Sequence, residues 1–158
     1  MGLSSLSKSN VIQTVWEGFY DRLSNVSSVS ITGPVTVTIQ TYTNSFPDKS
    51  LDEKGDYPIL VVNSPNINWE NFTFRKKQVN GKITIDIYTT QSESADKFTD
   101  AIIDSIETYR DDLKDYRITN VSLDSTDRDS SFRGSFKCHV ASATFNFKYK
   151  FVETNPGS

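Results

Sequence analysis

Residues 57–110 carry the pattern that most constrains the fold, because an alternating strand there runs directly into a two-faced helix. Ile83, Ile85 and Ile87 alternate with polar residues, which is the period of a strand with one buried face. Asn80-Gly81 precedes them, and this dipeptide is the strongest short signal for a hairpin turn, since both central residues of such a turn need positive φ. The sequence therefore predicts a hairpin turn at 80–81 followed by a half-buried strand.

A helix is predicted immediately after this strand. Thr90 and Glu93 have the spacing of a capping box, in which each side chain satisfies a free backbone donor. Beyond them, apolar and acidic residues form two stripes that lie about opposite each other at roughly 100° per residue. We expect the apolar stripe to cover a sheet and the acidic stripe to face outward. The apolar stripe is Ala95, Phe98, Ile102, Ile106 and Tyr109, and the acidic stripe is Asp96, Asp100, Asp104, Glu107 and Asp111.

The pattern of apolar residues in the first half of the chain predicts one more helix and two strands, with a long loop between the strands. Apolar residues recur with helical spacing over 10–24, and Val35, Val37 and Ile39 alternate in a strand predicted over 35–42. Residues 43–56 have no periodicity and mix Pro, Gly and charge, and a loop of this length in a small domain is usually functional or disordered. Residues 57–62 form a short apolar run, typical of a strand buried on both faces, with Pro58 near its start.

The last third predicts a strand over 116–123, a solvated loop over 124–131 and a long final strand over 136–151. In this final strand Phe136, Cys138 and Val140 share one parity, whereas the later aromatic residues share the other. A change of parity moves the apolar residues to the opposite face of a sheet. Either a β-bulge lies near 140–142, or the strand crosses between two apolar surfaces.

These elements predict an α+β fold, with a mixed and mainly antiparallel sheet packed against two main helices and a long C-terminal β-hairpin. A chain of 158 residues is typical of a single domain. We expect about 10–152 to be ordered, and 1–8 and 153–158 to be mobile. Aromatic residues make up 12% of the chain, enough large rings to build a core that has few leucines. No apolar run approaches the ~18 residues of a membrane span, so no membrane contact is expected.

Catalytic chemistry is not predicted. His139 and Cys138 are the only histidine and cysteine, and as strand neighbours they point to opposite faces. Two such residues fall short of the roughly four ligands of a zinc site, and no glycine-rich phosphate loop is present. Paired carboxylates such as Asp127 and Asp129 leave a carboxylate-dependent hydrolase or nuclease as an alternative. We expect a protein that is not an enzyme and that has no cofactor and no metal.

The order of elements, together with the segments 56–62, 72–75 and 83–88 and the helix from Glu93, resembles the tail terminator (tail completion) proteins of tailed bacteriophages. Related neck proteins of similar size also fit this pattern over about 11–152. The resemblance implies a subunit of a hexameric ring that caps the tail tube, ends its polymerisation and provides the head–tail joining surface. Its partners would be further copies of itself, the tail-tube protein and a head-connector or neck protein, with DNA passing through without specific binding.

The same resemblance implies a protein of the virion tail or neck, assembled in the host cytoplasm. The alternative is another head–tail connector, or a structural protein of the tail tube or baseplate. The net charge of −3 gives no reason to expect a nucleic-acid binder. We expect the acidic stripe, Asp96 to Asp111, to face the channel through which the DNA passes.

Two further surfaces are predicted for this assembly. An over-long final strand suits strand addition to the sheet of a neighbouring subunit, and long charged loops suit contacts between rings. The predicted subunit-contact strand contributes Phe136, Val140, Phe145, Phe147 and Tyr149. The predicted inter-ring loops contribute Phe46, Asp48, Lys49, Asp52, Glu53, Lys54, Asp127, Arg128 and Asp129.

Overall fold

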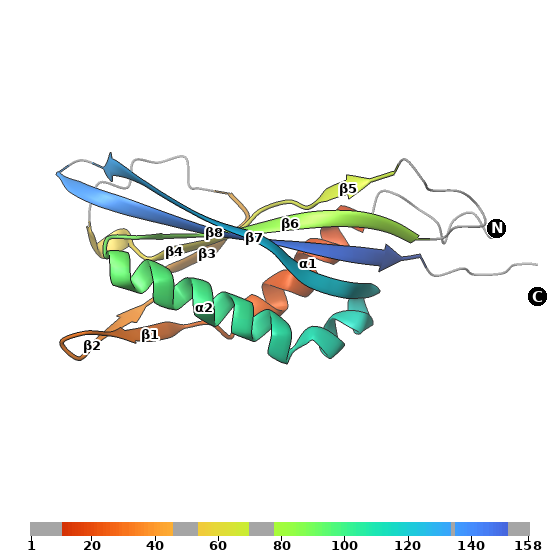
Figure 1. Cartoon of the computed structure of the whole chain (residues 1–158), viewed down its shortest axis with the longest axis horizontal. Helices are drawn as coiled ribbons and strands as arrows, with labels where there is room; N and C mark the ends of the chain where they lie inside the picture. The colour runs from red at the N-terminus through yellow and green to blue at the C-terminus, as the bar shows by residue number, and fades with distance from the viewer. Residues whose placement is uncertain (1–10, 46–53, 70–77, 134, 152–158) are drawn as a thin grey trace, which may run out of the picture.

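A computed structural model describes residues 11–45, 54–69, 78–133 and 135–151 and places a long sheet over two helices (Figure 1). The helical elements are α1 (Val11–Leu23), α2 (Ser92–Thr108) and the short 3-10 helices Lys54–Asp56 and Arg110–Tyr116. The shorter strands are β1 (Ser28–Ile31), β2 (Val35–Thr38), β3 (Thr41–Thr43), β4 (Ile59–Val62) and β5 (Asn66–Asn68). The three long strands are β6 (Gln78–Thr89), β7 (Ile118–Arg133) and β8 (Phe136–Lys150).

The main sheet has the strand order β3-β4-β6-β8-β7, and β5 pairs with β6 further along the edge that β4 also uses. Strand β3 is parallel to β4, and the other pairs in this sheet are antiparallel. Strands β7 and β8 form the long C-terminal hairpin. The predicted α+β class, the mixed and mainly antiparallel sheet and the closing hairpin are therefore confirmed. No helix among the described residues is long and apolar enough to span a membrane.

Both main helices cover one face of the sheet because each has an apolar stripe with helical spacing. Helix α1 lies within the predicted range 10–24. Four residues of α2 are almost fully buried against the alternating isoleucines of β6, as the sequence predicts. The separate β1–β2 hairpin runs alongside α2 and contacts it through β1, as Figure 1 shows. The buried stripes are Val11, Val15, Phe19 and Leu23 in α1, and Ala95, Phe98, Ile102 and Ile106 in α2.

Aromatic rings fill the centre of this core. The ring of Phe19 lies between those of Phe145 and Phe147, at centroid distances of 6.3 Å and 5.8 Å. Trp16 donates its indole N–H to the carbonyl oxygen of Val62 at 2.6 Å, which satisfies the one polar atom of that side chain. Burial of a Phe side chain contributes about 1.5–3 kcal/mol. The helical layer is therefore anchored to the second half of β8.

The parity change in β8 arises because the strand serves two apolar surfaces. Its pairing with β6 is continuous from Gln78↔Lys150 to Thr89↔His139, so no bulge interrupts it. The later aromatics face the helices, whereas Phe136 and Cys138 face the other side of the sheet. There they form a small second core with three residues of 57–61, and the rings of Tyr57 and Phe136 meet edge-on at 5.6 Å. Bulges occur in β7 instead, between Thr119 and Ser125.

The hairpin predicted at Asn80-Gly81 is wrong, because both residues lie inside β6. They pair with Lys148 and Phe147 of β8 on one side and with β5 on the other. Glycine is required at position 81 for a different reason. A Cβ there would lie 2.5 Å from the Phe147 ring and 2.8 Å from the Asn66 carbonyl oxygen. Glycine inside a strand commonly marks such a close approach.

Two predicted strands have different limits in the structure. The strand expected over 35–42 is broken, because β2 ends at Thr38 and β3, in the main sheet, begins at Thr41. The strand expected over 116–123 extends to Arg133, so the predicted loop 124–131 is the outer half of β7. All side chains of 124–131 are exposed, and this explains why their composition resembles that of a loop. The buried strand near 57–62 is confirmed, since β4 is buried at every position.

The predicted capping box does not form. Gln91 occupies the N-cap of α2 and makes no side-chain cap hydrogen bond. Ser94 instead donates its hydroxyl to the Gln91 carbonyl at 2.8 Å and lies 2.6 Å from the Thr89 hydroxyl. Glu93 accepts the backbone N–H of Thr32 at 2.8 Å. Its carboxylate therefore ties the β1–β2 turn to the start of α2 rather than capping the helix.

Candidate functional site: the outer face of the sheet

The face of the sheet opposite the helices carries a network of polar side chains from β6 and β8. Thr84 and Thr144 are cross-strand partners whose hydroxyls lie 2.9 Å apart. Asp86 accepts hydrogen bonds from the Ser142 hydroxyl at 2.5 Å and from the Asn63 amide at 2.8 Å. These half-buried groups are mutually satisfied, so they stabilise the register of the strands.

A cleft of about 940 Å³ opens on the sheet at the end where β5 pairs with β6. Four strands contribute to it, and the strand register arranges their polar side chains in two rows across the sheet. The half-buried indole of Trp69 lines one side, and its ring packs on Phe151 at 6.0 Å. The first row is Asn68, Asn80 and Lys148, and the second is Asn66, Lys82, Asn146 and Ser122.

The two lysines of this cleft differ in their surroundings. Lys82 makes an ion pair with Asp124 at 3.3 Å. Asp124 also accepts a hydrogen bond from the Asn146 amide at 3.1 Å. This hydrogen bond is the largest cause of a lowered pKa of the Asp124 carboxyl, and the hydrogen bond and charge of Lys82 lower it further. Lys148 is half-buried and has no ion-pair partner among the described residues. The cleft therefore presents one uncompensated ammonium group among several amides.

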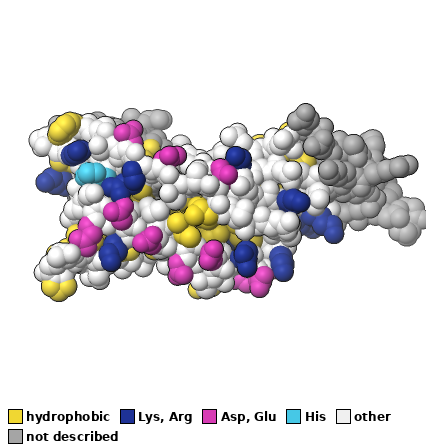
Figure 2. Space-filling model, viewed as in Figure 1, with side chains coloured by type: hydrophobic (Ala, Val, Ile, Leu, Met, Phe, Trp, Pro, Cys, Tyr) yellow, Lys and Arg dark blue, Asp and Glu magenta, His cyan; other side chains and the backbone are white. Residues whose placement is uncertain are grey.

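The predicted acidic stripe is exposed, but it is not a continuous negative wall. Arg128 of β7 binds Asp96 and donates a second hydrogen bond to the Ser92 hydroxyl at 3.1 Å. Lys114 pairs with Asp111 at 3.4 Å, and Asp111 lies in the following 3-10 helix rather than in α2. Figure 2 shows acidic and basic side chains interspersed over this view of the molecule. Asp100, Asp104 and Glu107 are thus the members of the stripe that form no ion pair with another described residue.

The predicted subunit-contact strand has no free edge, so its predicted strand addition is wrong. Strand β8 lies between β6 and β7 and is hydrogen-bonded on both sides. Its aromatic side chains are buried in the subunit's own two cores, and Val140 is half-buried. The edge of the sheet next to β8 belongs to β7. The aromatics concerned are Phe136, Phe145, Phe147 and Tyr149.

The predicted inter-ring residues are only partly described. Phe46, Asp48, Lys49, Asp52 and Glu53 lie outside the described residues, and Lys54 is exposed in a short 3-10 helix. Asp127, Arg128 and Asp129 lie on β7 rather than on a loop. Asp127 and Asp129 are exposed and form no ion pair within the described part of the chain.

His139 and Cys138 occupy opposite faces of β8, as their adjacency predicts. Cys138 is buried in the small second core. Within the described ranges no three His, Cys, Asp or Glu side chains lie close enough together to hold a metal ion. Burial lowers the pKa of His139, and the nearby charges of Lys137 and Arg128 lower it further.

The His139 titration is a direct test of this arrangement, since the chain has a single histidine. We expect Lys137→Ala to raise the pKa of His139 toward its ordinary value, because the substitution removes a positive charge that disfavours the imidazolium. Proton NMR of the imidazole ring measures the midpoint without interference from other histidines. Lys97→Ala, on α2, is the control and should leave the midpoint unchanged. A midpoint that does not move in Lys137→Ala would contradict the assigned electrostatic contact.

Sequence reasoning missed the cleft, because its rows join residues from four segments far apart in the chain. The one available signal was the polar parity of β6 and β8, where Lys82, Asn146 and Lys148 alternate with apolar residues. That alternation identifies the outward-facing side chains of each strand, but it does not show which strands lie beside it in the sheet. Comparison of the sequence with protein-family models finds no match, and comparison with curated proteins finds none either.

Proposed function

We propose that this chain is a structural virion protein that forms a ring on the end of a bacteriophage tail tube. The ring ends tube polymerisation and offers the surface to which the head joins. The resemblance in element order and size carries the family assignment, and the α+β fold with one helix-covered sheet face is compatible with it. In this proposal the partners are further copies of the chain, the tail-tube protein and a head-connector protein.

The observation that carries the proposal is that the two edges of the sheet are unequal. At one edge β3 has three residues, and at the other β7 has sixteen, with a free outer side. Unequal edges suit a heterologous contact, in which one surface of a subunit meets a different surface of the next, and such contacts close into rings when the rotation allows. The exposed residues 124–131 of β7 are the surface that we assign to contacts with an adjacent ring or partner.

The charge of α2 fits a channel wall that DNA passes without binding. Asp100, Asp104 and Glu107 are exposed along one face of the helix. Phosphate groups that approach this face meet like charge, and screening confines the effect to about 8–10 Å at physiological ionic strength. In this proposal, repulsion by these three carboxylates is enough to keep DNA from binding to the subunit surface.

Electron microscopy of purified tail tubes mixed with the protein tests the proposal. We expect a ring at one end of each tube and an arrest of further growth when tube protein is added afterwards. Bovine serum albumin at the same concentration is the control for nonspecific binding. Lengthening of tubes by the added protein would identify a tube subunit instead, and bare tube ends would contradict the proposal.

A further inference from the structure

The tip of the β7–β8 hairpin carries the most exposed large apolar side chain in the described part of the chain. Phe132 is 75% exposed, and burial of its ring against a partner would be favourable because it removes apolar surface from water. Its cross-strand partner is Lys137, so the two side chains lie on the same face of the hairpin. Lys137 is exposed and forms no ion pair with another described residue. The tip therefore offers an aromatic ring beside an ammonium group.

This face of the tip carries a net positive charge. His139 lies two residues from Lys137 and therefore on the same face of β8. Burial lowers the pKa of His139, and the nearby charges of Lys137 and Arg128 lower it further. Arg128 is bound to Asp96, so Lys137 is the cation of this group that no described carboxylate neutralises.

A small apolar patch lies in the seam between α2 and β7. Leu123 pairs with the core residue Phe145, so its side chain points to the helix side of the sheet, yet it is 43% exposed. The side of α2 that faces β7 is marked by Asp96, which Arg128 of β7 binds. Ile103 follows Asp96 by seven residues, which is about two turns, so it lies on that same side, where it is half-buried. Figure 2 shows apolar side chains gathered in the middle of this view of the molecule.

Acidic side chains border this seam. Asp100 and Glu107 lie three residues before and four residues after Ile103, so they are its neighbours on the surface of α2. Both are exposed, and neither forms an ion pair with another described residue. The seam is thus an apolar patch with a negative border, whereas the tip is an apolar ring with a positive neighbour. These opposite charges favour a second copy of the chain as the partner of each surface.

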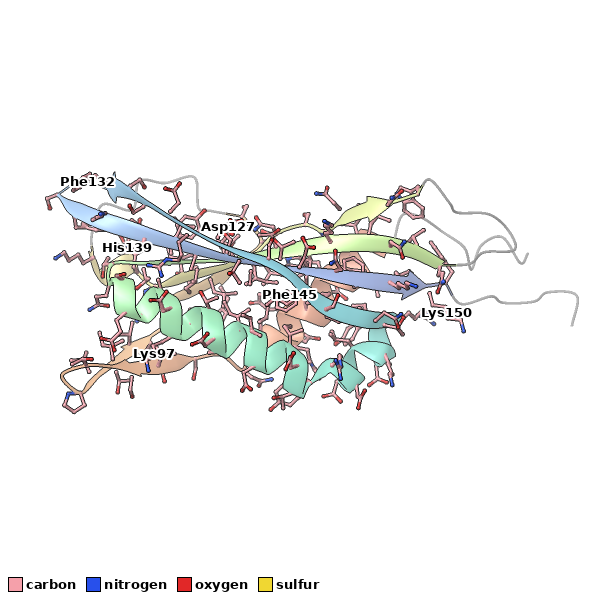
Figure 3. The ribbon with its side chains drawn as sticks, viewed as in Figure 1. Lys97, Asp127, Phe132, His139, Phe145 and Lys150 are labelled. Carbon is pink, nitrogen blue, oxygen red and sulfur yellow. The ribbon has the colours of Figure 1, made fainter. Side chains whose placement is uncertain are left out.

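Phe132 cannot reach the seam of its own subunit. It lies nine residues beyond Leu123 on β7, which is about 31 Å at ~3.4 Å per residue. Figure 3 shows Phe132 at one end of the sheet and Phe145, the partner of Leu123, near its middle. Both Phe132 and Leu123 nevertheless point to the helix side of the sheet. Phe132 does so because it follows the Ser131–Cys138 pair, whose cysteine belongs to the second core on the other face.

We propose that two copies of this chain form a two-fold dimer in which the hairpin tip of each copy enters the seam of the other. Phe132 packs on Leu123 and Ile103 of the other copy, and Lys137 lies against the acidic border there. Because tip and seam lie on the same side of the subunit, a single two-fold rotation makes both contacts at once. This inference goes beyond the proposed function and does not rest on it. The dimer covers the acidic border that the proposed ring leaves facing the channel, so dimer and ring are alternative assemblies of the chain.

Sedimentation velocity over a concentration series tests the dimer. We expect the unaltered protein to shift from monomer to dimer as its concentration rises. Phe132→Ser and Leu123→Ser should each raise the dissociation constant about tenfold or more, because each removes one side of both apolar contacts. Val35→Ser is the matched control, since Val35 is 45% exposed on the separate β1–β2 hairpin and should leave the constant unchanged. A protein that stays monomeric at the highest concentration measured, or an equal loss in the control, overturns the proposal.

Cysteine cross-linking then tests the assigned contact. One variant carries Phe132→Cys and the other Leu123→Cys, and the mixture is oxidised at equal concentrations. We expect a disulfide between positions 132 and 123, because the second contact of this mixed dimer keeps both native side chains. Val35→Cys replaces Leu123→Cys in the control, and each variant alone corrects for the native Cys138. A 132–123 yield no higher than the 132–35 yield overturns the proposal.

A charge exchange tests the ionic part of the contact. We expect Lys137→Glu to raise the dissociation constant about fivefold, since the dimer contains this contact twice. Addition of Asp100→Lys and Glu107→Lys to the same chain should restore it. Lys97→Glu makes the same charge change outside the contact and should have a smaller effect. A loss that the reversed carboxylates do not restore overturns the assigned role of Lys137.

The outcomes separate this dimer from the proposed function. A protein that caps tubes but stays monomeric in solution retains the function and loses the dimer. A protein that dimerises but leaves tube ends bare retains the dimer and loses the function. Cross-linking of position 132 to the tube protein alone, when tubes are added, overturns the self-contact in favour of that partner. Unchanged circular dichroism spectra of the variants show that the differences do not come from unfolding.

Discussion

Replacement of Phe145 by alanine is expected to lower the free energy of unfolding by about 3–5 kcal/mol. The side chain is 1% exposed, and its ring contacts that of Phe19 beneath the centre of the sheet. Loss of the ring removes apolar burial and leaves a cavity that the surrounding isoleucines of β6 fill only in part. Urea denaturation followed by circular dichroism measures the change as a shift of the midpoint at constant slope.

Phe132→Ala is the matched control, because it removes the same atoms from the same hairpin at a site that is 75% exposed. Its effect on unfolding should lie within about ±0.5 kcal/mol. The pair of variants separates the two roles of the aromatic hairpin, since Phe145 belongs to the core and Phe132 to the surface. Similar losses in both variants would contradict this division.

The parts of the fold that periodicity predicts are those with one apolar side. The isoleucine strand of β6 and the two-faced helix α2 each bury one stripe, so their sequence pattern records their environment directly. Strand β4 is buried on both faces and appears as a short apolar run. The fold class follows from the order of these elements and needs no long-range information.

Strand β7 could not be predicted at its full length, because its outer half is exposed on both faces. A strand with no buried side has no apolar alternation, and charged residues such as Asp127 and Asp129 are typical of edge strands protected against aggregation. Backbone pairing with β8 holds this segment extended, and the side chains of Asp124 and Arg128 add contacts to Lys82 and to α2. The same pairing leaves β8 without a free edge for strand addition, and the sequence of β8 alone does not reveal which strands lie beside it.

Replacement of Gly81 by alanine is expected to destabilise the fold by about 1–3 kcal/mol. The added Cβ would lie 2.5 Å from the Phe147 ring and 2.8 Å from the backbone oxygen of Asn66, so β5 must shift. The loss of chain entropy in the unfolded state favours alanine by only about 0.4–1 kcal/mol, less than the packing cost. Gly55→Ala is the control, because a Cβ there meets nothing within 4 Å. Urea midpoints compare the two variants.

Asn80→Thr shows whether this loss arises inside a strand or in a turn, since alanine at 81 would be unfavourable in both. In β6, position 80 is an exposed strand site opposite Lys148, where a β-branched residue is favoured. In a type I′ turn the same site needs positive φ, which a β-branched residue disfavours. The strand therefore predicts that Asn80→Thr is neutral or stabilising while Gly81→Ala destabilises. If both substitutions destabilise the fold, residues 80 and 81 form the hairpin turn that the dipeptide suggests. They would then not line the cleft as part of β6.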